Sequence, residues 1–368
     1  MVKVRIGIIG CGNISAAYLR TVQTFSVLNC VAVSDILPER ARAAADTYGI
    51  PRACSPEELL ADPEIQIVVN LTTPQSHTAV NLAALEAGKH VYTEKPLAVA
   101  REDGARVIAL AEAKGLRVGC APGTFLGGGL QTCRKLIDDG AIGRPVAAAA
   151  FMMGHGHESW HPDPAYYYKR GAGPMFDMGP YYLTALTTLL GPIRRIAGIA
   201  GIQIGERTIT SQPKYGEKIT VETPDHVTGL IEFSSGAIGT IITTFATWHS
   251  QLPRIEIYGT EGTLNVPDPN TLAGPVSIAC AGTREFVDVP LTHGHSDGHA
   301  MWGIGVAEMA HALLADRPHR ASGRQAYHVL DLMNGFLESS AGSVYYETVS
   351  SMECPAPLPT GLPEDQLD

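Results

Sequence analysis

The segment VRIGIIGCGNIS, residues 4–15, joins an apolar strand pattern to two closely spaced glycines and the start of a helical pattern. Residues 4–9 have the composition of a strand, and residues 14–24 that of a helix. Gly10 permits a tight turn between them, and Gly12 lets a pyrophosphate approach the main chain at the positive end of the helix. This strand–turn–helix unit predicts that the chain begins with an α/β fold.

The pattern that follows repeats this alternation as far as residue 120. Residues 65–71 form a near-continuous apolar run, which suits a strand buried on both faces of a parallel sheet. Strands are expected at 30–33, 65–71, 90–93 and 116–119, and helices at 38–48, 76–87 and 101–114. Such alternation predicts a doubly wound parallel sheet with right-handed crossovers, a Rossmann domain spanning residues 1–122.

Strands dominate the second part of the chain. A helix is expected at 130–138, followed by strands at 145–153, 227–233, 237–248, 254–258, 263–266, 276–280 and 284–289, and by amphipathic helices at 301–316 and 326–338. Adjacent antiparallel strands favour an open sheet. We therefore expect an α/β domain over residues 123–345 with a large open, mostly antiparallel sheet, whose last helices pack back on the first domain. Residues 346–368 form a tail rich in proline and acidic residues, either unfolded or bound to the surface.

Composition narrows the class of protein. The chain has 368 residues, 45% of them hydrophobic, and a formal net charge of −10. That charge disfavours a nucleic-acid partner. The seven cysteines are scattered without a Cys-x-x-Cys pair, which favours a reducing compartment, here the cytoplasm. Since no run of 18 apolar residues occurs, no membrane span is expected.

The glycine turn and the second strand together indicate a dinucleotide site. Gly10, Gly12, Asn13 and Ile14 form the turn and the helix start, with Ser15 in place of the usual third glycine. Asp35 ends the second strand, where its carboxylate can accept hydrogen bonds from ribose hydroxyls and repel a 2′-phosphate. The expected cofactor is therefore NAD, with NADP the less favoured alternative because Arg40 is near.

Two further motifs carry polar side chains suited to catalysis. Thr93-Glu94-Lys95-Pro96 lies at the carboxyl end of a predicted parallel strand, the edge where doubly wound sheets bind ligands. Asp177 and Tyr181 are four residues apart, so one helix places both on the same face. Pro180 fits only the first turn of that helix, which puts Asp177 near its positive end.

The glycine turn, Glu94-Lys95-Pro96 and Asp177-x-Gly-x-Tyr181 together resemble the Gfo/Idh/MocA oxidoreductase family over residues 2–338. The resemblance implies a Rossmann domain followed by an α/β domain with an open sheet. It also implies that Lys95 lies beside the nicotinamide, that the peptide before Pro96 is often cis, and that Asp177 orients the substrate. It places Thr72, Thr73, Pro74 and His77, together with Glu94, at the cofactor.

Tyr181 stands where many family members carry histidine. Tyrosine here resembles the glucose–fructose oxidoreductase and dihydrodiol dehydrogenase branches, in which it is the acid/base. A free tyrosine has a pKa of about 10, and we expect Lys95 and the nicotinamide cation to favour the phenolate. Tyr181 then exchanges a proton with the substrate while Asp177 holds a neighbouring hydroxyl. The alternatives are a solvated Lys95, an Asp177 that only caps the helix, and a Tyr181 that is only a core aromatic.

Substrate contacts are expected from the segment after the strand at 145–153. Aromatic and hydrogen-bonding side chains gather there and suit a sugar: His155, His157, Trp160, His161 and Tyr168, with Phe125 from the start of the second domain. His155 and His157 share the spacing of a metal pair on a strand face, and His293, His295 and His299 form a second cluster. No metal is predicted, because these histidines also suit substrate binding or a loop without ligand. The glycines at 127–129 permit close approach of a ligand or form a hinge.

The leading interpretation is an NAD-dependent enzyme that transfers hydride between the cofactor and a hydroxyl or carbonyl group of a sugar, glycoside or polyol. Two alternatives remain: a regulatory protein that senses NAD without catalysis, and an enzyme that uses NAD transiently for epimerisation or elimination. An open sheet exposes an apolar face that a monomer rarely leaves bare, so a homodimer or homotetramer is expected.

Overall fold

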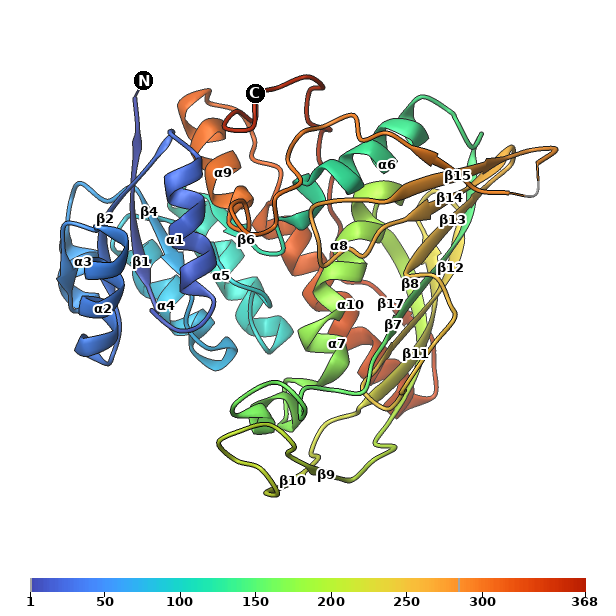
Figure 1. Cartoon of the computed structure of the whole chain (residues 1–368), viewed down its shortest axis with the longest axis horizontal. Coiled ribbons are helices and arrows are strands. Elements are labelled where there is room, and N and C mark those ends of the chain that lie inside the picture. The colour runs from blue at the N-terminus through green and yellow to red at the C-terminus, as the bar shows by residue number, and fades with distance from the viewer. Residues whose placement is uncertain (1, 284) are drawn as a thin grey trace.

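A computed structural model describes residues 2–283 and 285–368. Residues 1 and 284 lie outside the description, so the predicted first residue of the strand at 284–289 falls there. The two parts of the chain lie side by side, with the N-terminal sheet and its helices on the left of Figure 1 and the second sheet on the right. Helices of the second part fill the space between the two sheets.

The first domain is a parallel sheet in the order β3-β2-β1-β4-β5-β6 within the described residues. This is the doubly wound order, and ligands bind where it reverses, beside β1 and β4. Its strands are β1 (Val4–Ile9), β2 (Leu28–Ser34), β3 (Ala53–Cys54), β4 (Ile67–Asn70), β5 (His90–Thr93) and β6 (Val118–Cys120). Its helices are α1 (Ser15–Thr24), α2 (Pro38–Tyr48), α3 (Pro56–Ala61), α4 (Pro74–Glu86) and α5 (Arg101–Ala113).

The sequence pattern anticipated most of these elements but missed β3 and α3. The strand β3 is only two residues long, too short for a periodic signal. The helix α3 carries the sequence signature of a capped start: Ser55 accepts a hydrogen bond from the main chain of Glu58, whose side chain reaches back to Ser55.

The second domain is built on a sheet in the order β16-β15-β14-β13-β7-β12-β11-β8-β17, antiparallel except where β12 runs parallel to β7. The large, mostly antiparallel sheet is therefore confirmed. Its strands are β7 (Pro145–Met153), β8 (Ile193–Gly201), β11 (His226–Phe233), β12 (Ile238–Thr244), β13 (Ile255–Gly259), β14 (Gly262–Val266), β15 (Val276–Cys280), β16 (Val287–Val289) and β17 (Tyr346–Glu347). The strand β8 was missed. A small hairpin, β9 (Glu206–Thr208) and β10 (Lys218–Thr220), stands apart.

Helices cover one face of this sheet, the face toward the first domain (Figure 1). They are α6 (Gly128–Asp138), α7 (Gly173–Asp177), α8 (Gly179–Leu190) and α10 (Gly323–Gly342). The short helices η1 (Thr124–Leu126) and η2 (Pro164–Tyr168) pack beside α6 and α7, and α9 (Ile304–Leu314) packs on β6 of the first domain. Every residue of α8 is buried, because this helix lies between the sheet and the first domain. The helix α10 also contacts the first domain, where Arg101 forms an ion pair with the buried Asp331.

The C-terminal tail is bound to the surface, and the unfolded alternative is wrong. Leu358 and Leu367 are buried, with 3% and 0% of their surface exposed. His293 Nε2 donates to the carbonyl oxygen of Leu358 at 3.0 Å, and His295 Nε2 donates to that of Gln366 at 2.8 Å. Two histidines of the second predicted cluster therefore hold the tail, and His299 is exposed.

The glycines at 127–129 serve packing between segments of this chain. A Cβ atom on Gly128 would lie 2.5 Å from the carbonyl oxygen of His293, and one on Gly129 would lie 2.2 Å from that of Ala273. The start of α6 thus fits only without side chains, and neither expected role, ligand approach or hinge, accounts for these glycines.

Candidate functional site: a cleft edge shared by two domains

The β1–α1 turn is open toward solvent at the carboxyl edge of the first sheet. Gly10 has a φ of +103°, and a Cβ atom there would lie 2.6 Å from the main chain of Leu71, so only glycine fits. A Cβ atom on Gly12 would meet nothing within 4 Å. Gly12 and Asn13 are exposed, and Ile14 is half-buried, which leaves the main chain before α1 free to meet an anion.

Asp35 fixes the shape of this turn. Its two carboxylate oxygens accept hydrogen bonds from the main-chain nitrogens of Cys11, at 2.8 Å, and Leu37, at 2.9 Å. The side chain is half-buried beside the turn, at the end of β2. The predicted arrangement of the turn and the acidic residue is therefore present in three dimensions.

The β4–α4 loop lies beside the turn, but its histidine faces inward. Thr72 and Pro74 are half-buried and Thr73 is exposed, so all three can contact a ligand at this edge. His77 is fully buried, and its ring nitrogens lie 2.7 Å from the carbonyl oxygen of Pro96 and 3.0 Å from that of Thr72. His77 therefore links the loop after β4 to the loop after β5, and its ring does not face the cofactor site as predicted.

Glu94 and Lys95 follow β5 at the same edge. Glu94 is buried, and it accepts hydrogen bonds from the hydroxyl of Tyr18 at 2.7 Å and from the main chain of Lys95 at 2.9 Å. The Lys95–Pro96 peptide is cis. Tyr18, on α1, thus ties the glycine turn to the lysine loop, a contact that no local sequence pattern indicated.

The lysine meets the second domain at Asp177, 82 residues away along the chain. Lys95 Nζ donates to the main-chain oxygen of Asp177 at 2.6 Å and to its Oδ1 at 2.7 Å. Asp177 ends α7, and Tyr181 lies in the first turn of α8. Lys95 Nζ is 5.2 Å from the centre of the Tyr181 ring. The three predicted catalytic side chains are therefore neighbours, and Asp177 does not cap the helix.

Lys95 and Asp177 are largely buried, and the charge of each sets the protonation of the other. Burial alone would lower the pKa of Lys95, but the charge of Asp177 raises it above its usual value. Burial would raise the pKa of Asp177, but Lys95 and His157 hold it below its usual value. The two residues are thus an ammonium and a carboxylate at neutral pH.

Tyr181 differs from the expectation in its charge. Burial raises the pKa of Tyr181 above the usual value of a tyrosine, and the opposing effect of Lys95 is smaller. The expected lysine-assisted phenolate is therefore not the resting form of the free chain, which holds a neutral phenol next to an ammonium.

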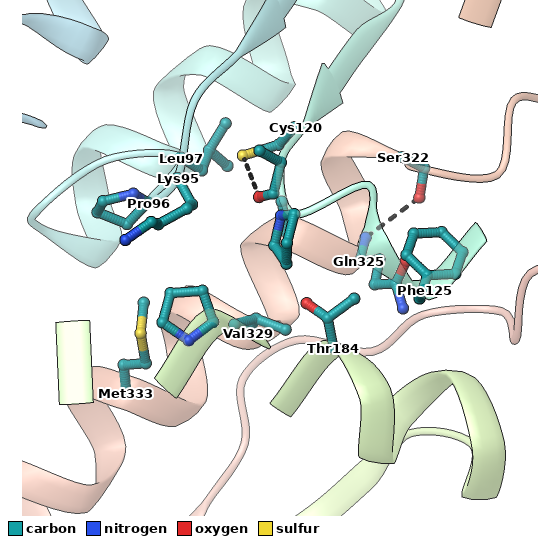
Figure 2. A pocket seen from close by; sticks show the side chains of 14 residues that line it. Lys95, Pro96, Leu97, Cys120, Phe125, Thr184, Ser322, Gln325, Val329 and Met333 are labelled. Atoms are coloured by element: carbon teal, nitrogen blue, oxygen red, sulfur yellow. Dashed lines mark hydrogen bonds between the residues drawn. The ribbon is translucent and has the colours of Figure 1, made fainter. Parts of the chain in front are cut away.

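Figure 2 shows the pocket between the domains beside Lys95. Its lining comes from the loops after β5 and β6 and from η1, α8 and α10, and most of it is apolar. The buried Phe125 forms one wall, and Gln325 at another wall already donates to Thr188 Oγ1 at 2.9 Å. The walls around Phe125 carry few free polar groups that a hydroxylated ligand could bind. Phe125 therefore belongs to the contact between the two domains rather than to the expected substrate site.

Comparison with known proteins identifies the family. Residues 4–121 match the Gfo/Idh/MocA oxidoreductase family with an NAD-binding Rossmann fold, and residues 130–265 match the Gfo/Idh/MocA C-terminal domain. The chain belongs to the Gfo/Idh/MocA oxidoreductase family.

Several members of the Gfo/Idh/MocA family align with most of the chain. Levoglucosan dehydrogenase of Pseudarthrobacter phenanthrenivorans is 26% identical over 341 residues, covering 84% of this chain and 86% of its own. The 1,5-anhydro-D-fructose reductase of Ensifer adhaerens is 28% identical over 267 residues, covering 71% and 74%. An NAD-binding oxidoreductase from Klebsiella pneumoniae has the same fold, with a TM-score of 0.82 at 21% identity over 95% of this chain and 100% of its own.

The residues at the β1–α1 turn fit the NAD that this Gfo/Idh/MocA domain binds. Gly12 has free space beside it, the main chain of α1 begins at an exposed turn, and Asp35 is held at the end of β2. These features would place a pyrophosphate at the turn and ribose hydroxyls at Asp35. When bound, NAD supplies or accepts hydride at its nicotinamide ring.

Asp35 is expected to set the preference for NAD over NADP. Replacing it with serine removes the charge that repels a 2′-phosphate and frees the two main-chain N–H groups that it now occupies. The ratio of NADP to NAD affinity should rise at least tenfold, which is about 1.4 kcal/mol. Fluorescence titration with both reduced cofactors measures this ratio. Glu39→Gln, on the first turn of α2, is the matched control, and an unchanged ratio in Asp35→Ser would contradict the prediction.

The loop after β7 brings aromatic rings to Asp177. The strand ends at Met153, so His155 and His157 lie in a loop and not on a strand face. The ring of His155 stacks on Trp248 at a centroid distance of 3.4 Å. The ring of His157 lies 3.8 Å from that of Tyr167 and 5.2 Å from that of Trp160. His161 adjoins Tyr167 at 5.3 Å, and Trp160 is 61% exposed.

Tyr168 is not a substrate contact. It is fully buried, its hydroxyl accepts a hydrogen bond from the main chain of His157 at 3.3 Å, and its ring packs on Arg207. Tyr167, the preceding residue, is the tyrosine whose ring lies beside His157. Three consecutive tyrosines carry no local signal that shows which of them faces the site.

No group of three or more potential ligands is placed to hold a metal ion among the described histidines, cysteines and carboxylates. None of the described helices has the length and apolar character needed to cross a membrane.

Proposed function

We propose that this protein is an NAD-dependent dehydrogenase or reductase that acts on a hydroxyl or carbonyl group of a sugar, glycoside or polyol. The observation that carries the proposal is the contact between Lys95 of the first domain and Asp177 of the second, with Tyr181 beside the lysine. The three groups lie at the sheet edge that holds the Gly10–Gly12 turn and Asp35.

In this proposal Tyr181 exchanges the proton. During reduction the neutral phenol donates its proton to the substrate oxygen, while Lys95 stabilises the negative charge that develops there. For oxidation, Lys95 and the nicotinamide cation would favour the phenolate before the reaction, and the phenolate would take the proton from the substrate hydroxyl. Asp177 holds Lys95 in place and accepts a hydrogen bond from a neighbouring substrate hydroxyl.

A carbohydrate substrate is supported by the aromatic groups around Asp177. Trp160 and Tyr166 present exposed rings, 61% and 45% exposed, and His161 lies between them at centroid distances of 5.4 and 5.7 Å. Broad apolar faces next to hydrogen-bonding groups suit a sugar ring. The curated relatives include one named a dehydrogenase and one named a reductase of a sugar, and these names leave the direction open.

The test is a panel of aldoses, glycosides and inositols with NAD and NADP, read by the absorbance of the reduced nicotinamide. Net formation or loss of NADH with at least one of these compounds supports the proposal. Substrate conversion without net NADH indicates transient use of NAD for epimerisation or elimination. Binding of NAD without any turnover across the panel indicates an NAD-sensing protein and overturns the proposal that this protein is an enzyme.

The uncovered face of the second sheet supports a homodimer or homotetramer. Ile199, Leu230 and Ile238 lie on the outer faces of β8, β11 and β12 and are 78%, 56% and 62% exposed. The register pairs Leu230 with Thr240, two residues from Ile238, so their side chains share one face.

Light scattering at micromolar concentration is expected to give twice or four times the mass of one chain. Combining Leu230→Lys with Ile238→Lys should yield a monomer, because it buries two charges in the contact. Leu314→Lys, a substitution at another exposed leucine, at the end of α9, should leave the mass unchanged. A wild-type monomer would overturn the assignment of this face.

Within the cell, seven free cysteines support a reducing compartment, the cytoplasm.

A further inference from the structure

His157 holds the carboxylate oxygen of Asp177 that Lys95 leaves free. Its Nε2 lies 2.9 Å from Asp177 Oδ2, while Lys95 Nζ lies 2.7 Å from Oδ1. The side chains of His157, Lys95 and Asp177 are only 12%, 16% and 14% exposed. The carboxylate is therefore clamped from both sides by groups that come from different domains.

The contact fixes the tautomer of His157. Asp177 is ionised, because Lys95 and His157 outweigh the effect of its burial and lower its pKa, and an ionised carboxylate can only accept. His157 Nε2 must therefore carry a proton. His157 Nδ1 is buried and has no hydrogen-bond partner in the described part of the chain. A proton on Nδ1 would be an unpaired donor next to the rings of Tyr167 and Phe245, which is costly.

We infer that His157 is a positioning residue of the hydride-transfer site: a neutral Nε2–H donor that keeps Asp177 aligned on Lys95. The inference rests on the proposed function and replaces the sequence-based assignment of His157 as a substrate contact. Without this donor, one oxygen of a buried carboxylate loses its partner, and the carboxylate is free to turn away from the lysine. Lys95 would then lose its fixed position beside Tyr181.

Two substitutions separate positioning from substrate binding. His157→Gln keeps an N–H donor at the place of Nε2, so kcat for reduction should stay within about threefold of wild type. His157→Leu removes the donor and should lower kcat about 10–100-fold with little change in KM, the range expected for one hydrogen bond to a charged group. His249→Gln, on an exposed loop, is the matched control.

The split between kcat and KM gives the readout that a purely structural role would not move. A lowered kcat in His157→Leu that is restored in His157→Gln, with KM and the His249→Gln control unchanged, is the expected result. A His157→Gln variant as slow as His157→Leu would overturn the inference. A His157→Leu variant with wild-type kcat and a raised KM would also overturn it, since it would make His157 a substrate contact.

A measurement without turnover distinguishes this inference from the proposed function. ¹⁵N-histidine NMR spectra of the full chain with bound NAD should show His157, assigned by its absence in His157→Gln, as the Nε2–H tautomer. Asp177→Asn should change that signal. This result stands even if no compound in the substrate panel reacts. The Nδ1–H tautomer, or a signal that Asp177→Asn leaves unchanged, would overturn the inference even in an active enzyme.

Discussion

Replacing Tyr181 with phenylalanine is expected to lower kcat about 10²–10⁴-fold in both directions, the range of a lost general acid or base. The Tyr181 ring lies beside the Lys95 ammonium, whose nitrogen is 5.2 Å from the ring centre. Because only the hydroxyl is removed from a buried ring, the fold and the affinity for NAD should stay as in wild type. Steady-state rates and fluorescence titration with NADH measure the two effects separately.

The matched control for this substitution is Tyr182→Phe. Tyr182 is also fully buried on α8, but it faces Arg254 and Asp268 rather than Lys95. Its loss should leave kcat within a few-fold of wild type. If the two variants were equally active, Tyr181 would be a core aromatic only, and the proton donor would have to be sought elsewhere.

The pH dependence of Tyr181 follows from the direction of its pKa. Burial raises this pKa, so the phenol keeps its proton through neutral pH despite Lys95. Reduction consumes that proton and should be constant near neutrality and fall at alkaline pH. Oxidation needs the phenolate and should accelerate as the pH rises. Tyr181→Phe should abolish both alkaline trends, and a trend that survives in this variant would assign the titration to another group.

Replacing Lys95 with methionine is expected to have the second large effect. Among the described residues, the substitution leaves His157 as the one polar side-chain partner of the largely buried Asp177 carboxylate. Removing one partner of a buried ion pair destabilises a protein by about 3–5 kcal/mol. Activity should fall at least about 10³-fold, because the ammonium that stabilises charge on the substrate oxygen is gone.

A second variant separates stability from chemistry. Adding Asp177→Asn to Lys95→Met removes the unpaired charge, so much of the lost stability should return while activity stays absent. Urea unfolding measures the first quantity, and NADH production the second. Recovery of turnover in the double variant, or more than a tenth of wild-type kcat in Lys95→Met, would show that the lysine only holds the domains together.

Local patterns in the sequence predicted the glycine turn and the place of Asp35, but not the inward direction of His77. Gly10 and Gly12 followed an apolar strand and preceded a helix, and the structure shows the positive φ and the open space that these glycines supply. Asp35 was found from its place at the end of the second strand. Such features are predictable because strand, turn and helix are set by neighbouring residues, whose periodicity and backbone freedom are visible in the sequence.

The substrate half depended on packing between distant segments. Asp177 and Tyr181 were recognised from their motif, but the aromatic groups were less well assigned. Tyr168 is buried against Arg207, and Tyr167 occupies the place beside His157. No periodic pattern extends through this loop, so the direction of each side chain is decided by the strands and helices that pack around it.

The sequence by itself determined the alternation of strands and helices in the first domain, the glycine turn, and the three motifs that carry Asp35, Lys95 and Asp177. Only the tertiary structure decided which of them meet: Lys95 and Asp177 are 82 residues apart, and His157 reaches the same carboxylate from a third segment. It also decided the charge of Tyr181. The strength of an ion pair and the pKa of a phenol depend on burial and on groups within a few ångströms. Distances of that kind exist only after the two domains have packed together.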